Sequence, residues 1–412
     1  MYRTNNILLG VLIIYATIFN PFNDGGKNML LVFSLPIFLA GAAIRNRDGL
    51  KGLFEKKNSI IWIFLIYFLL SSIVNFQSLR LSSLAYSLDF IICFILCIHL
   101  FKRPVNLRLY SKYLTIIIGI FFLALVIQQI GIVLGFDHFF NKLDSTDYYI
   151  ESNYIFNLNS LSTEPSYAVT IVSVAFYSIL KMRRIENDGN YVLLDFLKDT
   201  PVWAMYLYQL VFYRSVFGIL FFVMICIYLV DFKKIKTWIL LGCFSFVLGV
   251  LSANYEALGR LFTIFKMLDL HNITELAQID HSGSMRVLPL YYYLVNFNFR
   301  DFHSYIGYGL DYSQDYIRAL IPGIPDGTAF GGLIPSFPFD FGIIGFGLLW
   351  KVISKFALMK WLSIEAIIIF LVMLNATFNT QMFWFVVLVF TINKFIVSSR
   401  TPKTPPLATA SE

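Results

Sequence analysis

Long runs of apolar residues without a single charge recur along this chain, as in residues 59–76 and 113–135. A helix needs ~20 such residues to cross the hydrocarbon core of a membrane. Apolar residues make up 58% of the chain and charged residues only 14%, whereas soluble domains carry about a quarter charged residues. Because so few charges cannot cover a water-facing surface, the sequence predicts an all-α, polytopic integral membrane protein in a lipid bilayer.

The apolar runs and the polar breaks between them predict about 12 transmembrane helices. The expected spans are residues 6–20, 29–44, 59–76, 83–101, 113–135, 166–182, 200–213, 215–230, 237–253, 340–358, 362–379 and 381–396. Only Arg214 separates the short span 200–213 from the next, so this pair forms either two crossings or one re-entrant hairpin. Residues 1–399 are expected to form a single multi-pass membrane domain, and residues 400–412 a disordered cytoplasmic tail.

Lysine and arginine predict the orientation of the helices, since short cytoplasmic loops are rich in both. Both termini are placed in the cytoplasm, where most of the 32 basic residues then lie. The outward basic residues are Lys27, Arg80, Lys142, Arg214, Arg260, Lys266, Arg286, Arg300 and Arg318. The net charge of +7 therefore reflects orientation, and no nucleic-acid partner is expected. Outer loops are expected at about 136–165 and 254–339, and the second should be partly helical because its aromatic stretch needs burial.

The segment STEPSYA, Ser162 to Ala168, holds the first candidate catalytic residue, where an outward loop enters a helix. One interpretation is structural: Thr163 or Glu164 caps the helix and Pro165 lies in its first turn. A carboxylate there is favourable by about 0.3–1 kcal/mol. The other interpretation is functional: Glu164 accepts a proton or a hydrogen bond from a substrate hydroxyl at the outer membrane face.

Outward arginines form the second group of candidates, because a guanidinium makes bidentate contacts with phosphate and stays charged. Arg214 lies between two apolar runs, where a charge needs a partner or a wet cavity. Arg286 directly precedes an aromatic segment of the second outer loop. Arg80 and Arg300 are weaker candidates, and Arg80 is better explained as an interfacial residue at a helix end.

Acidic residues within the expected spans leave a transporter as an alternative function. Asp89 lies in the span 83–101, and acids at such depth can relay protons. Glu365 is expected at the membrane interface, near the cytoplasmic end of its span. No histidine pair has metal-ligand spacing, and Asp311 and Asp315 form no DxD pair, so neither a metal ion nor a cofactor is expected.

Four short segments follow one another on the predicted outer side. They are TEPSYA, YRSVFGIL (Tyr213 to Leu220), HSGSMR with IGYGL (Ile306 to Leu310), and FGIIGFG (Phe341 to Gly347). In order, sidedness and overall topology the chain resembles the Wzy-type polymerases of the O-antigen ligase and polymerase superfamily. Ligases of this superfamily place a histidine shortly before a Gly-x-x-Gly pattern. Here that pattern begins at Gly342, and the corresponding region, Gly331 and Gly332, contains no histidine. This absence favours a polymerase over a ligase.

The resemblance implies a GT-C-like glycosyltransferase in the bacterial plasma (inner) membrane. It would move a growing glycan en bloc from undecaprenyl pyrophosphate to a sugar hydroxyl of a new lipid-linked repeat unit, at the outer face. The implied partners are the undecaprenyl-pyrophosphate-linked oligosaccharide and a polysaccharide chain-length regulator. A flippase or other transporter of lipid-linked oligosaccharides, which is not an enzyme, and an O-antigen ligase are the alternatives.

The same resemblance assigns roles to the candidate residues. Glu164 would orient or deprotonate the acceptor hydroxyl, while Arg214 and Arg286 would stabilise the charge that develops on the leaving pyrophosphate without a metal. The residues expected to bind substrate are Arg80, Arg300 and Tyr308.

Overall fold

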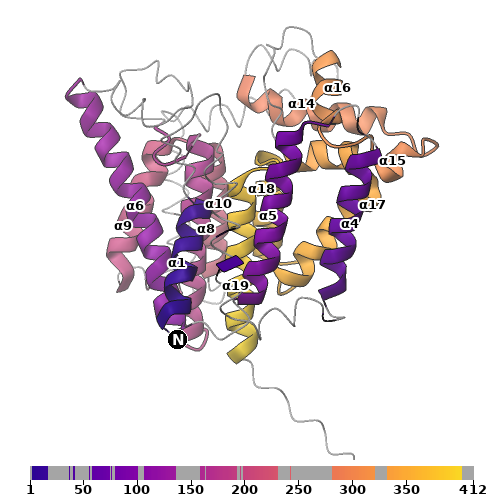
Figure 1. Cartoon of the computed structure of the whole chain (residues 1–412). Helices are drawn as coiled ribbons and strands as arrows, with labels where there is room; N and C mark the ends of the chain where they lie inside the picture. The colour runs from indigo at the N-terminus through magenta and orange to yellow at the C-terminus, as the bar shows by residue number, and fades with distance from the viewer. Residues whose placement is uncertain are drawn as a thin grey trace, which may run out of the picture.

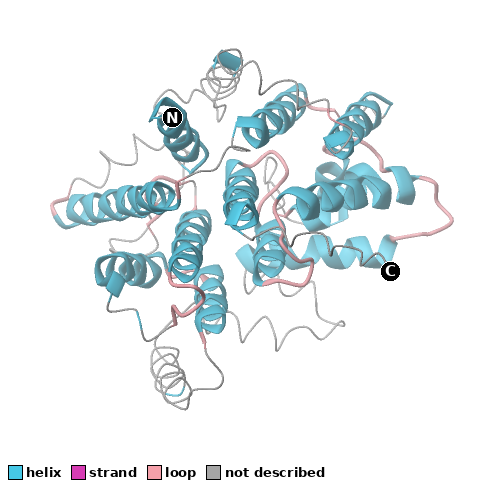
Figure 2. Ribbon diagram, turned by 90° about the horizontal axis from the view of Figure 1, so that it is seen from below, coloured by secondary structure: helices cyan, strands magenta, loops and turns pink. Residues whose placement is uncertain are grey.

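The computed structural model describes most of the chain as helices. The described residues are 2–16, 58–74, 79–100, 106–135, 158–162, 164–192, 198–230, 281–320 and 332–400, with positions 37, 40, 41, 55, 76, 195 and 242. Every element of regular secondary structure within these residues is a helix, which confirms the predicted all-α class. Figure 2, in which most helices are seen nearly end-on, shows them packed side by side.

The helices of the bundle overlap the expected spans. They are α1 Tyr2–Ala16, α4 Ser59–Val74, α5 Leu81–Leu100, α6 Leu107–Val133, α8 Pro165–Glu186, α9 Thr200–Tyr213, α10 Val216–Leu229, α17 Leu333–Phe356, α18 Ile364–Asn375 and α19 Gln381–Arg400. The spans expected at 29–44 and 237–253 lie almost entirely outside the described residues.

Five helices in the described ranges are long and apolar enough to cross a membrane: α5, α6, α8, α17 and α19. Shorter apolar helices accompany them, among them α4, α10 and α18. These helices indicate a membrane protein, as the sequence predicted. The number of about 12 crossings stays a prediction.

Helices α8 and α19 form the centre of the bundle. Helix α8 packs against α6, α9, α10 and α19, and its residues from Ala168 to Met182 are buried on every face, as expected for a helix that is surrounded by others. The Asn393 side-chain amide donates to Ser178 Oγ at 2.9 Å, and the Tyr110 hydroxyl donates to Asn393 Oδ1 at 3.1 Å. Because unpaired polar groups are costly in an apolar core, these bonds hold α6, α8 and α19 in one register.

Helices α9 and α10 form an antiparallel hairpin along α8. The ion pair between Arg183 and Asp199, at 3.0 Å, joins the end of α8 to the start of α9. The hairpin turns at Arg214, and Gly218 in the first turn of α10 lies against Val169 in the first turns of α8. The hairpin therefore follows α8 over most of its length. Each of its helices has 14 residues, or about 21 Å, against a hydrocarbon core of about 30 Å.

Three further helices, α14 His281–Asn296, α15 His303–Ile306 and α16 Tyr312–Leu320, cluster at the end of the bundle opposite the N terminus (Figure 1). They fall within 254–339, the segment predicted to form a partly helical outer loop. The rest of that segment before 281 and at 321–331, the loop at 136–157 and the tail after 400 lie outside the described residues.

Candidate functional site

Helix α17 is broken at Gly342, which adopts φ 64° and ψ 180°. The break leaves the carbonyl groups just before it without their usual helical donors. Segments distant in the sequence supply replacements: the Tyr308 amide donates to Phe339 O at 3.0 Å and the Gly309 amide to Asp340 O at 2.9 Å. The Tyr67 hydroxyl of α4 donates to Phe341 O at 2.8 Å and lies 3.0 Å from Ile306 O.

Gly307 lies against the backbone of α17 at this break. It has φ 88°, and a Cβ added there would collide with the backbone of Asp340 and Phe341. A Cβ on Gly342 would collide in turn with the backbone of Tyr305 and Ile306. The segments IGYGL and FGIIGFG, singled out separately in the sequence, therefore pack backbone to backbone, and only glycine fits at their crossing.

A small pocket of about 150 Å³, lined by both polar and apolar side chains, opens beside this crossing. Its lining residues come from α5, α16, α17 and the turn before α19: Arg80, Ser83, Ser87, Leu310, Asp311, Gln314, Ser336, Phe337, Asp340, Phe341, Thr377, Phe378 and Asn379. Arg80 forms an ion pair with Asp315 of α16 at 3.2 Å, and both side chains are about half exposed, at 49% and 54%. A cavity of this size holds one small ring or a phosphate-sized group.

Two carboxylates are buried against the pocket. Asp340 is only 7% exposed, and its Oδ1 accepts from the Ser313 amide at 2.8 Å. Asp311 is 9% exposed and adopts φ 68°, and its Oδ2 has no hydrogen-bond partner among the residues described. Burial raises the pKa of the Asp311 carboxyl, and the nearby Arg80 charge opposes that shift. Such a carboxyl is suited to accept a proton from a hydroxyl group.

A row of stacked aromatic rings extends from the crossing along α16. Successive ring centroids are 4.7 Å apart from His303 to Tyr308, 4.5 Å from Tyr308 to Tyr312 and 5.9 Å from Tyr312 to Tyr316. The Tyr308 hydroxyl donates to Asp301, and this bond lowers the pKa of the Asp301 carboxyl. Burial and the same bond raise the pKa of Tyr308, so its hydroxyl stays protonated and keeps donating.

The predicted residue Glu164 occupies the N-cap position of α8, with Pro165 in the first turn. Its side chain makes no capping hydrogen bond; instead it accepts from the Ser166 hydroxyl at 2.9 Å. Arg214, the other candidate nearby, ends α9 in the left-handed conformation, with φ 48°. Because α8 and α10 run parallel and touch at Val169 and Gly218, Glu164 and Arg214 lie at the same end of the bundle.

The structure brings the predicted residues together only in part. Arg80 pairs with Asp315 of α16 and Tyr308 stacks on Tyr312 of the same helix, whereas Glu164 begins α8 and Arg214 ends α9. Neither Glu164 nor Arg214 lines the pocket. Arg300 is exposed, and its backbone amide donates to Asn298 Oδ1 at 3.0 Å. Arg286 lies on α14, and its side chain is outside the described part of the structure.

The carboxylates of the pocket were not predicted as site residues. From the sequence, Asp311 shows only the absence of a DxD pattern. One signal was available for Asp340, since it stands two residues before Gly342 in the glycine-rich segment. Comparison with models of protein families, with curated proteins and with solved structures finds no match for this chain.

Charged groups inside the bundle form a separate feature. Glu365, in the first turn of α18, is buried at 6% exposure and paired with Lys181 of α8. Its place at the membrane interface stays a prediction. The Tyr177 hydroxyl also donates to Glu365, at 2.8 Å. Asp89 of α5 is buried and accepts from the Cys93 thiol at 3.4 Å.

Proposed function

We propose that this protein is a polysaccharide (O-antigen) polymerase. It transfers a growing glycan from undecaprenyl pyrophosphate to the sugar hydroxyl of a new lipid-linked repeat unit at the outer face of the bacterial plasma membrane. The observation that best supports the proposal is the junction of the two glycine segments, where one pocket holds Arg80 with the buried carboxylates Asp311 and Asp340.

The residues of this pocket suit the proposed transfer. The acceptor oxygen attacks the anomeric carbon, its proton goes to a carboxylate, and the bond from the sugar to the pyrophosphate breaks. In the proposal Asp311 or Asp340 takes the proton, and Arg80 stabilises the charge on the departing pyrophosphate, which arginine can do without a metal. The pocket is too small for a glycan, so the sugar chain lies across its mouth and over the aromatic row that includes Tyr308.

Glu164 and Arg214 have a different place in the proposal. They lie at the start of α8 and the end of α9 and do not line the pocket. A polymerase binds two lipid-linked glycans at once, and these residues suit contacts to the second of them. The roles of Arg286 and Arg300 stay predictions.

A transporter of lipid-linked oligosaccharides is the second candidate function. The buried pair of Lys181 with Glu365 and the buried Asp89 favour it, because ionisable groups inside a membrane bundle often serve transport. None of these three residues lines the pocket, although Asp89 follows the lining residue Ser87 on α5 by two positions.

The surface glycan of a deletion strain separates the candidates. Loss of long chains with single repeat units retained supports the polymerase, whereas loss of both supports the flippase or the ligase.

The variant Asp340→Asn then tests the pocket, since its amide oxygen can still accept from Ser313. We expect normal protein levels and only single repeat units. Normal long chains in this variant would remove Asp340 from the mechanism.

A further inference from the structure

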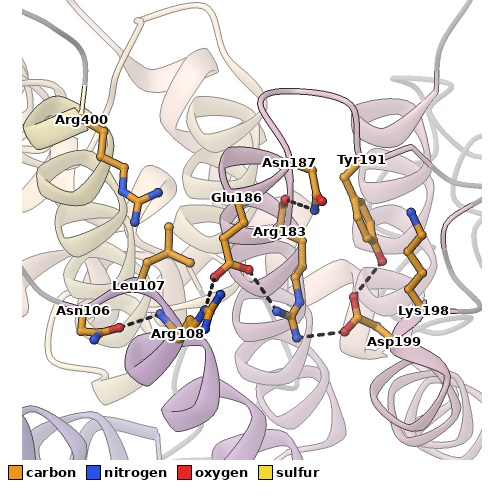
Figure 3. Close-up of a pocket in the computed structure, with 10 residues that line it drawn as sticks. All are labelled: Asn106, Leu107, Arg108, Arg183, Glu186, Asn187, Tyr191, Lys198, Asp199 and Arg400. Atoms are coloured by element: carbon orange, nitrogen blue, oxygen red, sulfur yellow. Dashed lines mark hydrogen bonds and ion pairs between the residues drawn. The ribbon is translucent and has the colours of Figure 1, made fainter.

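A second and larger cavity lies at the end of the bundle opposite α14, α15 and α16. Its volume is about 780 Å³, within the range of ligand-binding sites. Four segments of the chain contribute to it, shown in Figure 3: the start of α6, the end of α8, the turn before α9 and the end of α19. The lining residues are Asn106, Leu107, Arg108, Arg183, Glu186, Asn187, Tyr191, Lys198, Asp199 and Arg400.

Basic side chains outnumber acidic ones in this cavity. Its carboxylates, Glu186 and Asp199, are both engaged by Arg183, at 3.0 Å each. Asp199 also accepts from the Tyr191 hydroxyl at 3.0 Å. These bonds fix the carboxylates at one side of the cavity, and the basic lining residues Arg108, Arg183, Lys198 and Arg400 still outnumber them.

Of the remaining cations, Lys198 pairs with Asp195 at 2.7 Å, whereas Arg108 and Arg400 are exposed. Arg108 reaches Glu186 only at 3.8 Å, and its side chain is 90% exposed, so this pair contributes little. The Arg400 side chain points from the last turn of α19 toward the start of α6, where Arg108 lies (Figure 3). The N-terminal end of α6 adds positive potential at the same place. Two guanidinium groups beside a helix start form a site for a multiply charged oxyanion.

We propose that this cavity binds a phosphate group, held between Arg108 and Arg400. In a membrane protein such a group belongs either to the headgroup of an anionic phospholipid or to a free phosphate compound. Guanidinium pairs suit phosphate because each presents a planar fork of donors to two oxygens. The site is independent of the proposed polymerase pocket, which lies at the other end of the bundle.

The test uses the full-length purified protein and two probes. The first is vesicle lipid, either phosphatidylglycerol in phosphatidylcholine or phosphatidylcholine alone, with the bound lipid counted by native mass spectrometry. The second is inorganic phosphate, with the shift in unfolding temperature as readout. The site variant is Arg108→Ala with Arg400→Ala. The matched control is Lys112→Ala with Lys360→Ala, which removes two exposed charges near the same end and outside the cavity.

We expect the site variant to bind at least one probe roughly tenfold more weakly than the wild type, and the control to bind it equally well. Loss of phosphatidylglycerol alone identifies a lipid headgroup, and loss of the phosphate-induced shift identifies a free phosphate compound. Equal weakening in the control, or wild-type binding of neither probe, overturns the proposal. A second variant, Arg108→Lys with Arg400→Lys, keeps the charge and checks that the protein still folds.

Discussion

Gly307 and Gly342 cross with both residues at positive φ, 88° and 64°, and neither position has room for a Cβ. The crossing brings the turn after α15 against the broken helix α17. Around it lie Arg80, two buried carboxylates and a row of stacked aromatic rings. This junction is the structural basis of the proposed site, and it can be tested directly.

Replacing Gly342 with alanine should destabilise the protein strongly. The backbone conformation costs a non-glycine residue about 1–3 kcal/mol, and the collision with the Tyr305 carbonyl adds to this. Gly347→Ala is the matched control in the same helix, because its Cβ meets open space and alanine favours a helix by about 0.5–1 kcal/mol. The midpoint of thermal unfolding in detergent should fall for the first and hold or rise for the second. Equal midpoints would contradict the tight crossing.

Arg80→Ala should abolish long polysaccharide chains with little change in stability. The ion pair with Asp315 is half exposed, so its loss costs at most about 1 kcal/mol. Asp315→Ala removes the same pair but leaves the arginine, and its chain-length ladder on a gel should resemble that of the wild type. If both variants lose the ladder, the pair matters as a structural contact and Arg80 is not assigned to the pyrophosphate.

Glu164→Gln tests the functional interpretation of the STEPSYA segment. Glutamine keeps an acceptor for the Ser166 hydroxyl and removes only the charge, which contributes about 0.3–1 kcal/mol at a helix start. We expect shorter glycan chains and an unchanged amount of protein in the membrane. A normal ladder would leave Glu164 with a structural role at the start of α8.

The buried pair of Lys181 and Glu365 should show strong coupling. Lys181→Met leaves a buried carboxylate without its cation, which typically costs 3–5 kcal/mol. Adding Glu365→Gln should restore most of this loss, since the Tyr177 hydroxyl can still donate to the amide oxygen. A double-mutant cycle of unfolding free energies measures the coupling. Additive losses would show that the two side chains do not depend on each other.

The raised pKa of Asp311 predicts that the difference in stability between the wild type and Asp311→Asn depends on pH. The folded protein binds this proton more tightly than the unfolded chain, so the stabilising effect is complete at low pH and is lost as pH rises through the raised value. Asparagine also tolerates the left-handed backbone at this position. The unfolding midpoint of Asp311→Asn, relative to the wild type, should therefore rise as pH increases above about 4. A relative midpoint that falls with pH would mean that the Arg80 charge outweighs burial.

The sequence alone determined the all-α membrane class of the protein and the approximate positions of the long bundle helices that the structure describes. Uncharged runs such as 113–135 are long enough to form membrane helices whatever surrounds them, so α6 appears at Leu107–Val133. The proline after Glu164 likewise indicated the start of α8, because proline is favoured in the first turn of a helix, where its missing N–H is not needed.

Tertiary structure alone decided which helix ends meet. Nothing local to Asp340 indicates that Gly307 will cross the chain beside it, since the contact depends on how α4, α15 and α17 pack. The burial of Glu365 has the same origin: its span ends near the interface, but the packing of α18 against α8 gives it Lys181 as a partner. Apolar length fixes where a helix forms, whereas the burial of a charge depends on neighbours that lie far away in the sequence.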